Sequence, residues 1–174
     1  MSLLEFETFE LGSKRKYYGK YRGTVANNID PDGMARLLAV VPDVSNVALT
    51  SWAMPSLPWC GPQMGMVCVP PIGAGVWIEF EQGNADYPIW SGCYWGSPAE
   101  VPRSATLPSL GVTFQTLGQN IMQLSETGIK LSTKLGSIEI GEDKIKISHG
   151  LGKAATIELS FVTVKINEDA LEVM

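Results

Sequence analysis

The last third of the chain repeats a short apolar, charged, apolar pattern six times, at residues 129–131, 138–140, 145–147, 157–159, 164–166 and 171–173. This alternation is the period-two pattern of a strand with one buried face and one solvated face. The central charge alternates in sign along the series, from Lys130 to Glu172. We therefore expect very short strands whose solvated faces place a lysine of one layer near a glutamate of the next.

Strands this short do not make a stable unit alone. Glycine, serine, asparagine and aspartate separate them, which predicts tight turns. Such a repeat buries its apolar face only by stacking on neighbours. We expect several identical chains to wind together, pairing the flanks of the strands and closing a shared core; an ordinary meander of one globular domain is the alternative. The predicted core residues are Ile129, Leu131, Ile138, Ile140, Ile145, Ile147, Ile157, Leu159, Val164, Ile166, Leu171 and Val173.

The preceding part of the chain has a different pattern. Residues 17–26 and 36–41 are strand-like, and residues 76–81 and 87–95 form a predicted hairpin. Short strands with glycine and proline between them are typical of a small barrel. Residues 45–65 are predicted to be a long irregular segment, which in a compact domain is usually functional or an interface.

Composition changes abruptly between these two parts. All eleven prolines lie between Pro31 and Pro108, and from Ser109 onward there is no proline, tryptophan, tyrosine or cysteine. A shift of this kind marks a domain boundary. The predicted organisation is all-β, with an N-terminal arm (1–16), a small barrel (17–97), a linker (98–109) and the repeating tail (110–174).

The distribution of charge argues against a nucleic-acid partner. The formal net charge is −5, and there is no lysine or arginine between Arg36 and Arg103. A nucleic-acid surface needs cations that replace the counterions of the phosphates. The basic residues near the N-terminus are interpreted as a solvated arm or a partner contact: Lys14, Arg15, Lys16, Lys20 and Arg22.

The chain has 174 residues, of which 45% are hydrophobic, enough for a sizeable core. No apolar run is long enough to span a membrane. The first residues lack the pattern of a signal peptide. We expect the protein to be made and assembled in a cytoplasm.

Candidate chemistry is sparse. Cys60, Cys68 and Cys93 are widely spaced and lack a CxxC pair, so we interpret them as buried free thiols. His149 is the only histidine and is interpreted as a solvent-facing turn residue; the alternative is that three copies of it meet on a threefold axis. Without a second histidine, or a cysteine–histidine pair, a nucleophile has no base. We expect no catalytic residue, no metal site and no cofactor.

Glu79 and Glu81 lie two residues apart in a predicted strand and would share a face. Such a pair could mimic the paired carboxylates of acid–base catalysis. A solvated strand face is the simpler interpretation. Residues 73–75 read Gly-Ala-Gly but no helix follows them, so no phosphate-binding loop is predicted.

Two sets of motifs resemble a known family. The first comprises residues 21–25, Asp30-Pro31-Asp32-Gly33, Arg36 and 40–42; the second comprises residues 71–83, Tyr87-Pro88 and Gly92. Both resemble the oligonucleotide/oligosaccharide-binding (OB) type barrel of contractile-tail phage baseplate spikes (baseplate assembly protein V-like) and of type VI secretion spikes. Ala35 departs from the pattern, because a glycine before the arginine is more usual.

The resemblance implies an all-β homotrimer, with an N-terminal OB-type small barrel followed by an intertwined triple-stranded β-helix. It implies a structural, cell-puncturing role as the spike of a virion tail baseplate, docked on a tail hub protein and directed at the bacterial outer membrane. Some relatives carry a lysozyme domain between barrel and helix, and the short linker here leaves no room for one. Others end in a His-x-His iron-binding tip, which the single His149 does not supply.

The predicted tip consists of Glu172, Val173 and Met174. Because the repeat runs almost to Met174, we expect a blunt apolar end that a separate small tip protein caps; the rival expectation is that Met174 closes the point itself. The alternative function is a trimeric OB-type binding module that recognises a glycan or another envelope ligand. An exposed aromatic groove around Trp52, Trp59 and Trp95 would favour that alternative.

Overall fold

The computed structural model describes residues 15–102, 104, 111–150, 155–167 and 170–173. In this part of the chain, every regular element is a β-strand or a short 3-10 turn. The chain divides into two compact units, Met1–Pro98 and Ala99–Met174. The all-β fold class predicted from the sequence is confirmed.

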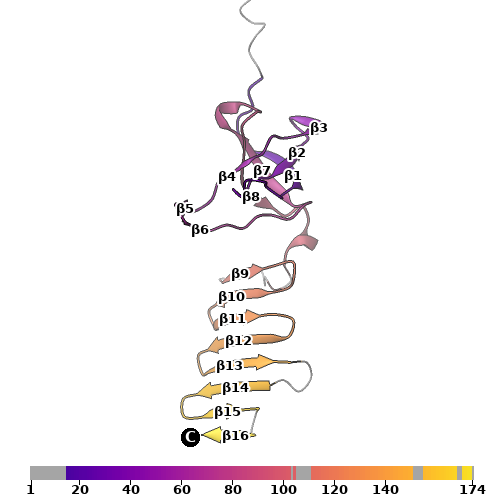
Figure 1. Ribbon diagram of the computed structural model, residues 1–174. Helices are drawn as coiled ribbons and strands as arrows, with labels where there is room; N and C mark the ends of the chain where they lie inside the picture. Colours follow the sequence, from indigo (N-terminus) through magenta and orange to yellow (C-terminus); the bar gives the residue numbers. More distant parts are fainter. Residues whose placement is uncertain (1–14, 103, 105–110, 151–154, 168–169, 174) are drawn as a thin grey trace, which may run out of the picture. The chain divides into compact units, whose positions relative to one another are not determined.

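The N-terminal unit contains a six-stranded sheet, with strands in the order β3-β2-β1-β7-β8-β4 (Figure 1). The strands are β1 (Tyr21–Asn27), β2 (Leu38–Val41), β3 (Ser45–Leu49), β4 (Met54–Pro55), β7 (Gly75–Phe80) and β8 (Pro88–Tyr94). Leu37 and Ala53, which precede β2 and β4, exchange backbone hydrogen bonds of 3.2 and 2.8 Å. This bridge joins the start of β2 to the start of β4, the last strand of the order, so the sheet closes into a small barrel.

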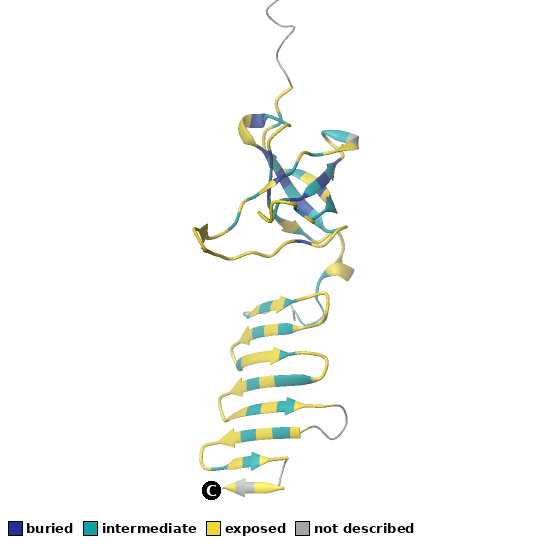
Figure 2. Cartoon of the chain, viewed as in Figure 1, coloured by how far each residue is buried: buried dark blue, intermediate teal, exposed yellow. Residues whose placement is uncertain are grey.

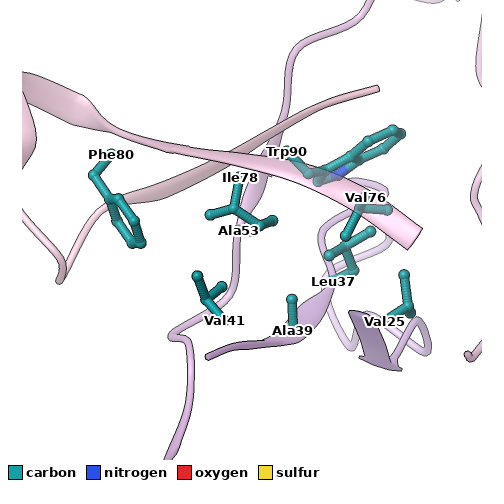
Figure 3. Packing of buried hydrophobic residues seen from close by; sticks show 9 residues of the cluster. All are labelled: Val25, Leu37, Ala39, Val41, Ala53, Val76, Ile78, Phe80 and Trp90. Carbon is teal, nitrogen blue, oxygen red and sulfur yellow. The ribbon is translucent and has the colours of Figure 1, made fainter. Parts of the chain in front are cut away.

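The barrel interior is filled by alternate residues of its strands, as Figure 3 shows. In β7, Val76, Ile78 and Phe80 are buried and the residues between them are only half-buried, which is the period-two pattern predicted from the sequence. Trp90 closes the core from β8, and its indole Nε1 donates a 3.0 Å hydrogen bond to the carbonyl oxygen of Ala35. The buried residues are Val25, Leu37, Ala39, Val41, Ala53, Val76, Ile78, Phe80 and Trp90.

The structure corrects two details of the predicted barrel. Residues 45–65 are not irregular: they contain β3, β4 and a separate hairpin made of β5 (Cys60–Gly61) and β6 (Met64–Gly65). Strand β7 ends at Phe80, and Glu81 begins the 3-10 turn η2 (Glu81–Gly83). Glu79 and Glu81 therefore do not share a strand face, because the chain leaves the sheet after Phe80 and continues as η2, in which Gln82 has a positive φ of 51°.

The C-terminal unit is one antiparallel sheet of eight strands that follow each other in chain order (Figure 1). They are β9 (Val112–Gln115), β10 (Ile121–Ser125), β11 (Gly128–Ser132), β12 (Gly136–Gly141), β13 (Lys144–His149), β14 (Ala155–Ser160), β15 (Val164–Ile166) and β16 (Leu171–Val173). The short 3-10 turn η3 (Pro98–Glu100) precedes them.

Strand pairing in this unit differs from the prediction that other chains pair the flanks. Each described strand pairs with the next strand of the same chain. The reason is the length of the connections: only residues 126–127 and 142–143 separate the strands that they join, and a two-residue connection folds the chain back on itself. The strand order is that of a meander, yet the apolar face of the sheet is exposed. Other chains would therefore cover this face and would not pair with the strands.

Candidate trimerisation surface and barrel sites

The twelve predicted core residues lie on one face of the C-terminal sheet, in two columns. In one column, Ile140 lies opposite Ile129 on one side and Ile145 on the other. In the second, Ile147 lies opposite Ile138 and Ile157. The pairing continues through β15 and β16 to Val173 and Leu171. The structure thus aligns on one face residues that span 44 positions of the sequence, from Ile129 to Val173.

The residues of this apolar face are open to solvent in the single chain. Figure 2 shows exposed and intermediate residues, and no buried ones, along these strands. Each of the twelve side chains is between 37% and 55% exposed. Exposed apolar surface that continues over eight strands is much larger than the scattered apolar residues of an ordinary monomer surface. Burial of an aliphatic side chain is worth about 1.5–3 kcal/mol when complete. The face therefore favours association with other chains.

The two columns also contain apolar residues that are not among the twelve predicted core residues. Val112 and Phe114 of β9 and Met122 and Leu124 of β10 continue the two columns beyond Ile129 and Leu131. All four are about half exposed. Their signal in the sequence is the same alternation with a neutral central residue, Thr113 or Gln123, in place of the charge.

The opposite face of the sheet has a central row of alternating charge. The register places Lys130 opposite Glu139, Glu139 opposite Lys146, and Lys146 opposite Glu158. The Nζ of Lys130 lies 2.8 Å from Oε1 of Glu139, and this contact is the main reason that the pKa of Glu139 is lowered. The sequence predicted this alternation of neighbours, and the register confirms it. Opposite charges at facing positions stabilise the register that brings them together.

The predicted tip is described only in part. Val173 is the last described residue and is 55% exposed in β16, the edge strand of the sheet. The backbone of Glu172 pairs with Lys165. Met174 lies outside the described residues.

His149 is the last residue of β13 and not a turn residue as predicted. It pairs with Gly136 and Ala155 and is exposed in the single chain. By alternation it lies on the same face as Ile145 and Ile147. The sequence interpretation was misled by Gly150, which begins the next connection one residue later.

The three cysteines are also exposed in the single chain, not buried as predicted. Cys60 belongs to the β5–β6 hairpin, where every residue of both strands is exposed. Partial burial raises the pKa of the Cys93 thiol, and Cys68 nearby adds to this effect. Among the described residues, no group of three or more histidine, cysteine or acidic side chains is arranged to hold a metal ion.

The basic residues near the N-terminus contact their own barrel where they are described. Lys20 pairs with Glu79, and its Nζ also donates to Oγ of Ser91 at 2.8 Å. The guanidinium of Arg22 lies 5.6 Å from the ring centre of Trp77 and 5.2 Å from that of Tyr94. An ion pair and cation–π contacts therefore join Lys20 and Arg22 to the barrel, although both residues remain exposed, as expected for a solvated segment. The partner contact that is the other interpretation of these residues stays a prediction. Lys14 lies outside the described residues.

The three tryptophans of the predicted groove have different surroundings. Trp52 is half-buried, with the guanidinium of Arg36 5.6 Å from its ring centre. Trp59 in the segment before β5 and Trp95 after β8 are 57% and 60% exposed. Within the described part of the chain, no ring-to-ring contact joins the three.

Fold and surface together define an all-β protein with a small barrel and a C-terminal unit built for association. Comparison with protein families gives the same division. Residues 21–95 match the type VI secretion system/phage-baseplate injector OB domain. Residues 111–172 match the phage baseplate V C-terminal trimerisation domain. The chain therefore belongs to the phage baseplate V-like family of injector spike proteins.

A comparison with curated proteins gives no match. The family assignment makes the C-terminal sheet a trimerisation domain and supports a homotrimer with a baseplate role. No helix in the described part of the chain is long and apolar enough to cross a membrane.

Proposed function

We propose that this protein is the central spike of a contractile-tail baseplate, a structural homotrimer that punctures the bacterial outer envelope during injection. The observation that carries the proposal is the apolar face of the C-terminal sheet, which is 37% to 55% exposed at its twelve predicted core positions. Three copies of this face, packed around one axis, would enclose a common apolar core. The charged rows would then face the solvent.

The mechanism is mechanical. The barrel docks on a tail hub protein, and the trimeric C-terminal unit transmits the force of sheath contraction to a small area of the outer membrane. Two features support rigidity: strand-to-strand hydrogen bonds run continuously from β9 to β16, and side chains from three chains would lock the sheets face to face. We further propose that the three sheets wind around one another and leave no free apolar edge.

Mass measurement in solution tests the oligomeric basis of the proposal. Sedimentation equilibrium of the full chain at micromolar concentration is expected to give three times the mass of the 18.8 kDa chain. A folded monomer at that concentration would refute the homotrimer and, with it, the spike. Particles assembled with a trimerisation-deficient variant are expected to adsorb to cells without injecting.

We propose that a separate small tip protein caps the C-terminal end, because β16 is an edge strand with Leu171 and Val173 more than half exposed. Deletion of residues 172–174 followed by analysis of tail-tip composition tests this. Loss of one small protein from the truncated particles supports the cap. Unchanged composition favours closure of the tip by the spike itself.

A glycan-binding barrel is the second candidate, and the exposed rings of Trp59 and Trp95 favour it. Aromatic rings stacked on sugars are a common mode of glycan binding in open sites. Retention of the full chain on immobilised envelope polysaccharide, lost in a Trp95→Ala variant, would support this function. If the chain is not retained, the glycan-binding function is excluded and the mechanical spike is the function that stands. We also propose that the protein is not an enzyme, so incubation with peptidoglycan is expected to release no soluble fragments.

A further inference from the structure

The β5–β6 hairpin is the longest continuously exposed segment rich in apolar residues among residues 15–98. Every residue from 58 to 69 is exposed, and Trp59, Met64, Met66 and Val67 are each about half exposed or more. Figure 2 shows the segment extending away from the barrel core as a continuous exposed strip. A long apolar segment of this kind, with no layer of its own chain over it, is unusual for a free surface.

The hairpin is held at its base and is not a loose loop. Ser56 N donates to the carbonyl oxygen of Trp90 at 2.9 Å before the hairpin, and Asn28 Nδ2 donates to that of Pro70 at 2.9 Å after it. Within the hairpin, Met66 N donates to the carbonyl oxygen of Trp59 at 2.9 Å. These bonds fix the direction of the segment, so its apolar side chains are presented in a defined arrangement.

The charge pattern indicates what covers the hairpin. Residues 44–78 contain no charged residue at all. A surface without charged groups can be covered by a second copy without the desolvation cost of an unpaired charge. The fully buried centre of homodimeric and other permanent interfaces is likewise depleted of charge and enriched in aromatic residues and methionine. Trp59, Met64 and Met66 fit that composition.

The trimerisation domain of the same chain supplies the second copy. Three barrels joined to one trimeric unit are present at a high effective concentration, which turns even a modest contact into a populated one. We propose that the β5–β6 hairpin of each protomer packs on the barrel of a neighbouring protomer and links the three barrels into a ring. This proposal rests on the homotrimer and concerns a contact that the C-terminal sheet does not make.

Photocrosslinking of the full chain tests the proposal directly. p-Benzoylphenylalanine in place of Trp59 reacts with any C–H group within reach, and the same group in place of Ile29 is the control, because Ile29 is 77% exposed in the turn after β1. Irradiation is expected to give covalent dimers and trimers from position 59 and monomers from position 29. If the chain with the photoreactive group at position 59 stays monomeric after irradiation, the proposal is wrong. This result is expected both for a hairpin that is free in solution and for one that folds onto its own barrel.

The rate at which Cys60 is alkylated gives a second test, which does not need a photoreactive group in the protein. In the purified trimer, alkylation of Cys60 is expected to be about tenfold slower than in a Trp59→Ser, Met66→Ser variant, because the neighbouring barrel covers it. An Ile29→Ser variant is expected to leave the rate unchanged. Equal rates in the native trimer and the double variant would overturn the proposal. The mass of the same samples separates this outcome from failure of the homotrimer itself.

Discussion

Arg36 Nη2 donates a 2.6 Å hydrogen bond to Oδ1 of Asp30, and this pair organises the turn between β1 and β2. The Asp30 carboxylate also accepts backbone N–H groups of Asp32, Met34 and Arg36 at 2.8–3.1 Å. Its side chain is 4% exposed. A single carboxylate thus satisfies most of the polar groups of a tight turn, which explains the Asp-Pro-Asp-Gly and arginine motif that the sequence singled out.

The Asp30 carboxylate predicts a defined pH dependence. The Arg36 guanidinium, with help from the backbone N–H groups, holds the pKa of Asp30 well below its ordinary value. Its stabilising contribution is therefore complete above the ordinary carboxyl pKa of about 4 and is lost as the pH falls below that value toward the folded-state pKa. An Asp30→Asn barrel is expected to be less stable at neutral pH and to lose less stability on acidification.

Tryptophan fluorescence is the appropriate measurement, because all five tryptophans lie between Trp52 and Trp95 and report on the barrel alone. Urea denaturation followed by this signal, from neutral to acid pH, gives the stability difference at each pH. Asp43→Asn is the matched control, since Asp43 is exposed in the next turn. Parallel pH profiles for the native chain and Asp30→Asn would contradict the prediction.

Ala35 is expected to be a site where glycine stabilises the barrel. Its φ is +59°, a left-handed conformation that costs a residue with a Cβ about 1–2 kcal/mol. Its carbonyl oxygen accepts the Trp90 indole hydrogen bond, which keeps the backbone in place. Ala35→Gly is expected to raise the free energy of unfolding by up to about 1 kcal/mol. Ala39→Gly, in buried strand β2, is expected to lower it, and a loss of stability in both variants would show that the strain at Ala35 is not felt.

Changes on the two faces of the C-terminal sheet are expected to have very different effects. Ile140→Asp or Ile147→Asp would place three unpaired carboxylates in the shared core, at a cost on the order of 3–5 kcal/mol per chain. Lys146→Ala, on the charged face, is expected to stay within about 0.5 kcal/mol. Thermal unfolding of the trimer, followed by circular dichroism, measures both. Similar shifts for the two classes of variant would show that the apolar face is not the shared core.

Gly128 and Gly141 face each other across β11 and β12 but are expected to differ in their tolerance of alanine. A Cβ at Gly128 would lie 2.0 Å from the carbonyl oxygen of Ile140, and its φ is +139°. A Cβ at Gly141 would meet nothing nearer than 3.6 Å. Gly128→Ala is expected to destabilise the sheet by about 1–3 kcal/mol, with a clear drop in trimer melting temperature. Gly141→Ala is the control, and an equal effect of both would place the strain elsewhere.

The sequence by itself determined the features that depend on local alternation. Period two assigned Ile138 and Ile147 to one face and Glu139 and Lys146 to the other, because side chains of a strand point to opposite sides whatever strand lies beside it. The turn chemistry around Asp30 and the alternation in β7 were equally local. The family resemblance followed from these same motifs, and both matched domains bear it out.

Only the tertiary structure decided which groups become neighbours and which are covered. Glu81 begins a turn, whereas His149 is still part of a strand. The alternation of apolar and polar residues does not show at which residue a strand ends, so the sequence placed both residues wrongly. In the single chain Cys60 is exposed, although cysteine is usually buried, because the β5–β6 hairpin leaves the barrel core. Strand pairing within one chain likewise follows from short connections, which have only two residues between β10 and β11 and between β12 and β13 and bring the next strand alongside.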